Sequence, residues 1–132
     1  MLSLKWQGVE MTKKLWGVDE LLLSRNCVEV HRMELIKGTC SSRHVHAIKH
    51  NLFTVFSGEV MIELYEPQKD DVLEVYQEIR LEAGDSYEVE PGIWHRFVVM
   101  DEGTVAIEIV WAATLHADIE RIDSSHHVAD EE

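Results

Sequence analysis

The chain has few cysteines, few basic residues and no long apolar run. Its 132 residues include only two cysteines, Cys27 and Cys40, too few for the disulfide framework of a small secreted domain. No apolar run reaches the ~18 residues of a membrane-spanning helix. The first residues also lack the charged, apolar and small-residue series of a secretory signal. We therefore expect reduced thiols, a cytoplasmic location and no membrane partner.

Acidic residues dominate the charge of the chain. Lysine and arginine number 12 against 25 aspartates and glutamates, which gives a formal net charge of −13. A field of that sign repels phosphate backbones, so nucleic acid is not an expected partner. The acids concentrate between residues 63 and 82 and near the C-terminus, so Arg43, Lys49 and Arg96 can still form a locally basic pocket.

Long helical periodicity is missing as well, and short segments rich in β-formers replace it. Turn signals separate these segments at intervals of roughly eight to twelve residues, which is typical of an antiparallel barrel or jelly roll. We expect strands over residues 27–36, 42–47, 51–56, 59–65, 72–76, 78–81, 86–90, 95–100 and 104–111. The sequence therefore predicts an all-β fold in one domain.

The two ends of the chain lack this pattern. Residues 1–26 carry the apolar patch Leu21 to Leu23 and are expected to pack on the barrel as a short helix or an edge strand. The barrel itself is expected over residues 27–115. Residues 116–132 lose periodicity and end in acids, which predicts a partly ordered tail in which the pair His126 and His127 has no role.

Three histidines indicate a metal site. His44 and His46 are two residues apart, so on an extended strand both imidazoles point to one face. His95 follows in a second stretch bounded by glycines. Three neutral imidazoles suit Zn, Fe, Mn or Ni and leave coordination positions open. The alternative is that the histidines only form hydrogen bonds inside a barrel, but convergence from separate strands favours a divalent metal.

The same residues form two motifs of a known family. The segments read Gly38-x5-His44-x-His46-x4-Asn51-x6-Gly58 and Gly84-x5-Glu90-Pro91-Gly92-x2-His95, separated by 25 residues. Both resemble the cupin motifs, and the resemblance spans residues 27–111. It implies an all-β, antiparallel double-stranded β-helix, the jelly-roll barrel of cupins. The segments KLWGVDE, NLFTVFSGEV, GIWHRFV and DIERID also resemble the cupin domain of type II phosphomannose isomerases.

The first motif departs from the family at its glutamate, where this chain has Asn51. By the motif register Asn51 is the expected fourth metal ligand, with His50 or a water molecule as alternatives. An amide oxygen is neutral, so the site would keep the full charge of the cation and favour an anionic ligand. The second motif has Glu90 in place of a proline and Val99 in place of an asparagine, which are framework changes.

Glu108 and Tyr87 are the candidate catalytic residues. Glu108 lies between apolar neighbours in a predicted strand, so it either faces inward with a raised pKa or faces solvent. Tyr87 either presents its hydroxyl to a ligand or packs in the core. His31 can line the pocket or lie on the surface. Cys40 has the strand parity of His44 and either faces the site or is a buried apolar cysteine.

Three functions fit these patterns. The first is a metal-assisted isomerase or epimerase acting on a sugar or sugar phosphate, with Glu108 or a histidine moving the proton. The second is a non-catalytic module that binds a metal and a small ligand. The third is a three-histidine cupin dioxygenase. A homodimer is expected from the resemblance, with Trp6, Trp16 and residues 21–23 as part of its interface.

Overall fold

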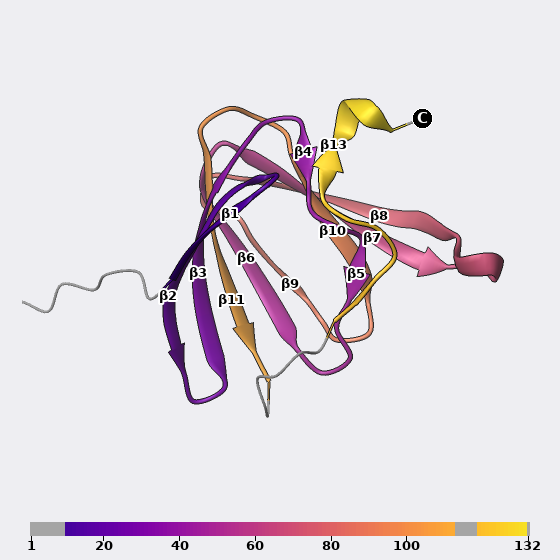
Figure 1. Ribbon diagram of the computed structural model, residues 1–132, viewed down its shortest axis with the longest axis horizontal. Coiled ribbons are helices and arrows are strands. Elements are labelled where there is room, and N and C mark those ends of the chain that lie inside the picture. The colour runs from indigo at the N-terminus through magenta and orange to yellow at the C-terminus, as the bar shows by residue number, and fades with distance from the viewer. Residues whose placement is uncertain (1–9, 113–118, 132) are drawn as a thin grey trace, which may run out of the picture.

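The computed structural model describes residues 10–112 and 119–131 and arranges them in two antiparallel sheets (Figure 1). The first sheet has the strand order β1-β2-β3-β11-β6-β9. Its strands are β1 (Glu10–Lys14), β2 (Gly17–Arg25), β3 (Val28–Leu35), β11 (Thr104–Trp111), β6 (His50–Ser57) and β9 (Ser86–Val89).

The second sheet is built around β10 (Trp94–Val99). On one side β10 pairs with β7 (Glu59–Pro67), which continues into a long hairpin with β8 (Leu73–Glu82). On the other side it pairs with the short strands β4 (Thr39–Cys40) and β5 (His44–Val45). The β7–β8 hairpin projects from the body of the molecule and carries the short helix η1 (Lys69–Asp71) at its tip (Figure 1).

The end of the chain also joins the second sheet. β12 (Glu120–Arg121) pairs with β5, and β13 (His126–His127) pairs with β4 before the short helix η2 (Val128–Asp130). These strands of two residues carry no periodic signal, so the sequence pattern did not reveal them. Neither η1 nor η2 has the length and apolar character needed to cross a bilayer, and the described residues contain no other helix.

The all-β antiparallel prediction is confirmed, with two local corrections. The expected strand over residues 42–47 is reduced to His44–Val45, because the residues on both sides of it are irregular. The expected segments 72–76 and 78–81 form one continuous strand, β8. Of the two alternatives for the N-terminal segment, the strand is present, as β1 and β2, and the helix is wrong.

Inward side chains change from polar to apolar along the strands of the first sheet. On β3 the inward residues are Glu29, His31, Met33 and Leu35, and Met33 and Leu35 are buried in the core. On β6 Asn51 is followed by the buried Phe53 and Val55. The apolar ends of the strands pack against Ile62, Leu64 and Phe97 of the second sheet. The polar ends are left to form a cavity.

The apolar end is tightly packed. Trp16 meets the edge of Phe97 with ring centroids 5.3 Å apart, and Ile62 has no exposed surface. Gly58 closes the first motif with φ +76°, and a Cβ there would lie 2.1 Å from Thr104 Oγ1. Only glycine fits this turn between β6 and β7. The packed apolar end therefore keeps the polar ends of the same strands at a fixed distance from one another.

Candidate metal centre and its cavity

His44, His46 and His95 converge on one point. Each offers a ring nitrogen, and these ligand atoms all lie within 4.8 Å of one another. The ring centroids of His44 and His95 are 4.4 Å apart, because the two residues are register partners on β5 and β10. His46, in the loop after β5, completes the group, and its ring centroid lies 5.0 Å from that of His44. The predicted convergence of the three imidazoles is present.

Backbone carbonyls fix the tautomers of two of these histidines. His44 Nδ1 donates to the carbonyl of Ser42 at 2.7 Å, and His95 Nδ1 donates to the carbonyl of Ile93 at 2.9 Å. In both rings the proton therefore lies on Nδ1, and Nε2 keeps its lone pair. Metal-binding histidines in proteins are usually held by such a contact on the other ring nitrogen.

Both imidazoles are also held in the neutral form. Burial lowers the pKa of His44 to about 3, and the neighbouring His95 adds to this effect. Burial likewise lowers the pKa of His95 to about 4, with a further contribution from His46. A neutral imidazole is the form that coordinates a cation, so these residues do not have to lose a proton to bind a metal near neutral pH.

Two buried side-chain polar atoms in the described part of the chain have no hydrogen-bond partner, His95 Nε2 and Asn51 Oδ1. An unsatisfied buried polar atom costs about 1–3 kcal/mol, so such atoms are rare without a reason. One is the nitrogen that the His95 tautomer leaves as an acceptor, and the other is the amide oxygen of the predicted fourth ligand. A cation would satisfy both atoms, so the residues present fit a divalent metal.

His44 and His46 border a cavity of about 420 Å³ between the two sheets, and Asn51 and Glu108 line it from the first sheet. His95 is buried and is not among its lining residues. Asn51 is buried and donates its Nδ2 to Glu108 Oε2 at 2.7 Å. This contact sets the orientation of the amide and leaves Oδ1 free to face a ligand. Burial raises the pKa of Glu108 and outweighs the charge of His31 and the hydrogen bond from Asn51, which lower it. Of the two expectations for Glu108, the inward one is therefore observed.

His31 also lines the cavity, although the sequence left its position open. Its Nδ1 lies 3.0 Å from Asp19 Oδ1, and its Nε2 lies 3.2 Å from Glu29 Oε1. Burial alone would lower its pKa, but the hydrogen bond and charge of Asp19, with Glu108 and Glu29, outweigh burial and raise it to about 9. With a carboxylate at each ring nitrogen, His31 is a cation at neutral pH.

Asp19 and Glu29 are site residues that the sequence analysis missed. A signal for Glu29 was available, because it shares the strand parity of Met33 and Leu35, which lie in the core. The apolar residues of the opposite parity on β3 obscured that signal. Asp19 lies beyond a bulge in β2, so no parity argument could have placed it.

Three basic side chains line the same cavity, Lys14, Lys49 and Arg121. Arg121 reaches it from the C-terminal segment and donates its Nε to Ser42 Oγ at 3.3 Å. Of the two basic residues considered beside the first motif, Lys49 is thus at the cavity. Arg43 is instead paired with Asp123 at 2.8 Å on the other face of the second sheet.

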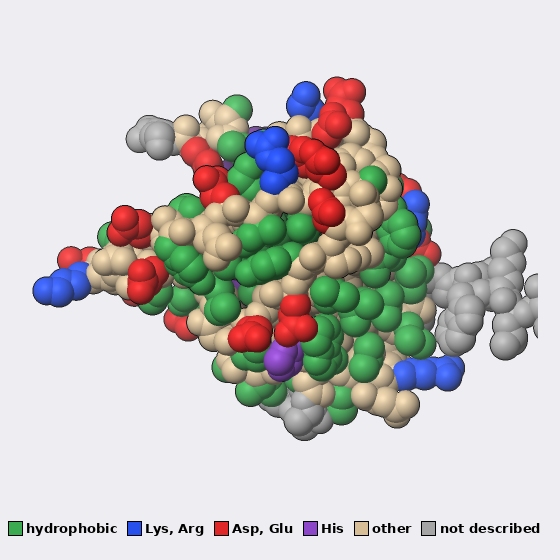
Figure 2. Space-filling model, turned by 180° about the vertical axis from the view of Figure 1, so that it is seen from behind, with side chains coloured by type: hydrophobic (Ala, Val, Ile, Leu, Met, Phe, Trp, Pro, Cys, Tyr) green, Lys and Arg blue, Asp and Glu red, His purple; other side chains and the backbone are tan. Residues whose placement is uncertain are grey.

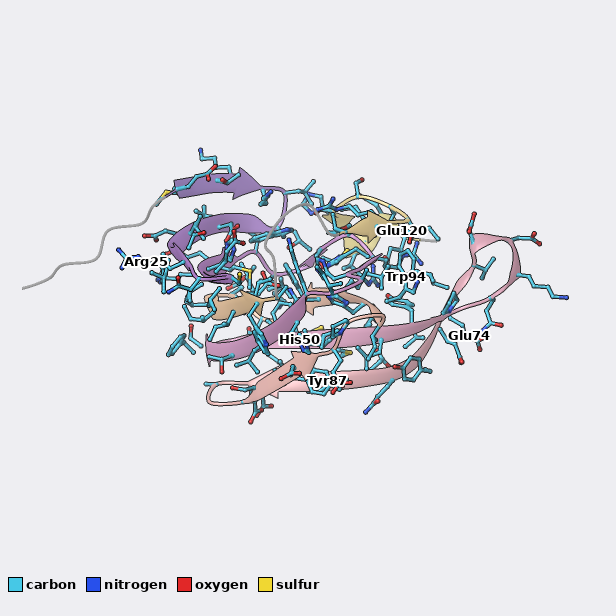
Figure 3. The ribbon with its side chains drawn as sticks, turned by 90° about the horizontal axis from the view of Figure 1, so that it is seen from below. Arg25, His50, Glu74, Tyr87, Trp94 and Glu120 are labelled. Atoms are coloured by element: carbon cyan, nitrogen blue, oxygen red, sulfur yellow. The ribbon has the colours of Figure 1, made fainter. Side chains whose placement is uncertain are left out.

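Several other candidates lie elsewhere. His50 stacks on Trp111 with ring centroids 5.1 Å apart, and its side chain contacts Glu88. It is therefore not positioned as the fourth ligand of the metal site. Tyr87 packs against the apolar core and is not among the residues that line the cavity; Figure 3 shows it on the outer strand β9. Trp16 belongs to the core and cannot serve as an interface residue. Trp6 lies outside the described residues.

The position of Cys40 differs from the one that its shared strand parity with His44 suggested. Its side chain contacts Arg96 and His126 on the face of the second sheet opposite to the three histidines. The irregular residues 41–43 break the alternation between Cys40 and His44. Cys40 is fully buried, as expected for the second alternative, but its neighbours are polar.

Solved structures of low sequence identity share the fold. KdgF from Halomonas sp. has a TM-score of 0.61 and 17% identity, with 82% of this chain and 87% of that chain covered. Pac13 from Streptomyces, a nucleoside dehydratase also solved with uridine, has a TM-score of 0.68 and 12% identity, with 93% of each chain covered. Oxalate decarboxylase OxdC from Bacillus subtilis has a TM-score of 0.68 and 11% identity, with 92% of this chain and 33% of that chain covered.

The family is shown by the sequence itself. No curated protein matches the chain significantly. The model of the cupin domain matches residues 31–112, which include both glycine-bounded motifs, the three converging histidines and Glu108. More than half of the chain is covered by this match, and the two antiparallel sheets agree with it. The chain therefore belongs to the cupin family.

Proposed function

We propose that the protein is a metal-dependent enzyme that transfers a proton within a small anionic sugar derivative, as an isomerase or epimerase does. The observation that carries the proposal is the pairing of two groups in one cavity. His44, His46 and His95 with Asn51 would provide a metal site, and a half-buried carboxyl group, Glu108, lies beside Asn51 in the cavity. Perturbed titratable groups in a polar cavity are typical of catalytic sites.

His44, His46 and His95, with Asn51 as the fourth residue, would hold the metal, and this ligand set suits Zn, Fe, Mn or Ni. When bound, the cation would supply a Lewis acid toward a carbonyl or hydroxyl oxygen of the ligand. The protein ligands are all neutral, so they leave the positive charge of the cation uncompensated. This arrangement suits a ligand that is itself an anion.

Glu108 is the proposed proton carrier. Its pKa is raised by burial, which brings the carboxyl group closer to the pH at which it can both accept and return a proton. Asn51 Nδ2 holds Oε2 of this carboxyl group in place. Glu108 would take a proton from the carbon next to a carbonyl group and return it to the neighbouring position or to the opposite face. Tyr87, outside the cavity, has no part in this proposal.

The charge of the cavity supports an anionic ligand. The four cations Lys14, Lys49, Arg121 and His31 outnumber the three carboxyl groups of Asp19, Glu29 and Glu108 by one. The cavity thus has no excess of acidic groups in a chain whose net charge is −13, and a divalent cation would make it more positive. A phosphate or carboxylate group near Arg121 and Lys49 would gain charge-assisted hydrogen bonds. A sugar phosphate meets both requirements.

The finer sequence predictions belong to the same proposal. They are the likeness to type II phosphomannose isomerases, the homodimer and the cytoplasmic location. Broad apolar areas on the face seen in Figure 2 suit a dimer, and Phe56 is 63% exposed. Trp16 is not available for that interface, because it is buried in the core.

The test is proton exchange in heavy water. Metal-loaded protein is incubated with hexose and pentose phosphates and with uronic acids, and deuterium incorporation and isomer formation are followed by NMR. We expect exchange in the wild type and a loss of at least 100-fold in Glu108→Gln, with metal content unchanged. Glu74→Gln, on the projecting hairpin (Figure 3), is the matched control and should keep full activity.

Three outcomes would count against the proposal. Tight binding of one of these ligands without exchange would make the protein a binding module. Oxygen consumption by the iron-loaded protein would make it a dioxygenase. Exchange that survives in Glu108→Gln would remove Glu108 from its role as proton carrier.

A further inference from the structure

A second group of metal-ligand atoms lies away from the three histidines. Cys40 on β4 and His126 on β13 bring Sγ and Nε2 to 3.5 Å, although they are 86 residues apart in sequence. Glu131 Oε2 lies 2.8 Å from the same nitrogen. The three ligand atoms all lie within 4.8 Å of one another. Thiolate, imidazole and carboxylate are the donors that Zn²⁺ takes in proteins.

This group is separated from the first centre by the second sheet. His95 and Arg96 are consecutive on β10 and point to opposite faces, and Arg96 Nη1 donates to Cys40 Sγ at 3.3 Å. The adjoining cavity of about 540 Å³ is lined by Arg96, His126 and Glu131, and none of the three histidines lines it. The C-terminal segment, yellow in Figure 1, runs along this side of the molecule.

The orientation of His126 suits coordination. Its Nδ1 donates to the carbonyl of Ser124 at 2.9 Å, which directs Nε2 toward Cys40 and Glu131. His44 and His95 in the first centre are oriented in the same way, because Nδ1 of each ring donates to a backbone carbonyl. Backbone pairing of β13 with β4 places His126 opposite Cys40, so the two ligands are held by the sheet rather than by a flexible loop.

The guanidinium of Arg96 does not exclude a cation here, because it is already paired with two carboxylates, Glu63 and Glu131. Arg96 Nη1 also donates to Cys40 Sγ. A cation binds a thiol as the thiolate, so binding releases a proton and lowers the charge that the cation adds. Arg96 would then donate to a thiolate and to a bound carboxylate.

We propose that Cys40, His126 and Glu131 form a zinc site that fastens the C-terminal segment to the second sheet. Water from the adjoining cavity would take the fourth position. The fastened segment also contributes Arg121 to the first cavity, so the zinc would fix one wall of it. This inference does not depend on the proposed catalysis, because the two sites share no ligand.

Cobalt is the probe, because thiolate coordination gives Co²⁺ a sulfur-to-metal charge-transfer band in the near ultraviolet. Reduced protein is titrated anaerobically with Co²⁺. We expect the band in the wild type and its loss in Cys40→Ser. Cys27→Ser is the matched control, because Cys27 is the other cysteine of the chain, and it should keep the band. The first centre has only nitrogen and oxygen ligands and contributes none.

A second pair of variants keeps the test decisive if Cys40→Ser does not fold. His126→Gln should weaken Co²⁺ binding at the thiolate site at least tenfold, whereas His127→Gln, at the exposed neighbour, should leave it unchanged. Absence of the band in the wild type, its persistence in Cys40→Ser, or equal effects of the two histidine variants would overturn the proposal. The cluster would then be an ion-paired contact only.

Discussion

The charge on His31 predicts how the stability of the protein depends on pH. Its pKa is about 9 in the folded protein and about 6.5 in the unfolded chain, because Asp19 and Glu29 hold the proton in the fold. At 1.36 kcal/mol for each pKa unit, this difference amounts to about 3 kcal/mol of folding free energy. That is a large share of the roughly 5–15 kcal/mol that stabilises a typical domain.

The sign follows from which state holds the proton. Below pH ~6.5 both states are protonated, and the full contribution is present. Between pH ~6.5 and ~9 only the folded state keeps the proton, so each pH unit lowers the free energy of unfolding by about 1.4 kcal/mol. Above the folded pKa the contribution is lost. The protein should therefore become less stable as pH rises from 6 to 10.

The assay is urea unfolding at pH 6, 8 and 10, for the wild type and for His31→Gln. Other groups titrate in this range, so the quantity of interest is the difference between the two proteins. We expect His31→Gln to be less stable by about 3 kcal/mol at pH 6 and to approach the wild type at pH 10. A difference that does not change with pH, or an NMR titration that places the His31 pKa near 6.5, would refute the reasoning.

Four further substitutions test the fold and the cavity. Gly58→Ala should lower the free energy of unfolding by more than about 3 kcal/mol, because φ is +76° and the new Cβ would clash with Thr104. Gly103→Ala has a similar φ but open space, so it should cost only about 1 kcal/mol in the same urea experiment. Ile62→Ala should cost about 2–5 kcal/mol, because its side chain has no exposed surface. Arg121→Gln should weaken binding of inorganic phosphate several-fold in calorimetry. Thermal stability should not change, since Arg121 is exposed. An unchanged phosphate affinity would show that Arg121 has no role in ligand binding.

The sequence predicted the parts of the fold that depend on regular alternation. The strands β6, β7, β9, β10 and β11 agree with the expected segments, because each buries at least one face and all but β11 end at a glycine, a proline or an acidic turn. The three histidines were predicted to converge because two lie at i and i+2 and the third follows a glycine-bounded stretch. Asn51 was placed correctly at the cavity by its register in the first motif.

Other features depend on contacts that no local pattern encodes. Cys40 and His44 point to opposite faces, because three irregular residues separate them and alternation does not continue through such a segment. The C-terminal segment is held by the ion pairs of Asp123 and Glu131 with arginines far away in sequence. The His31 cation requires carboxylates from two strands. Long-range charge pairs of this kind become visible only in the folded structure.

The most direct test of the metal centre is an anomalous difference map from a crystal soaked with Zn²⁺ and measured at the zinc absorption edge. We predict a peak between the two sheets, about 2.1 Å from a ring nitrogen of each of His44, His46 and His95. An absent peak, or one that lies beyond bonding distance of these nitrogens, would contradict the account.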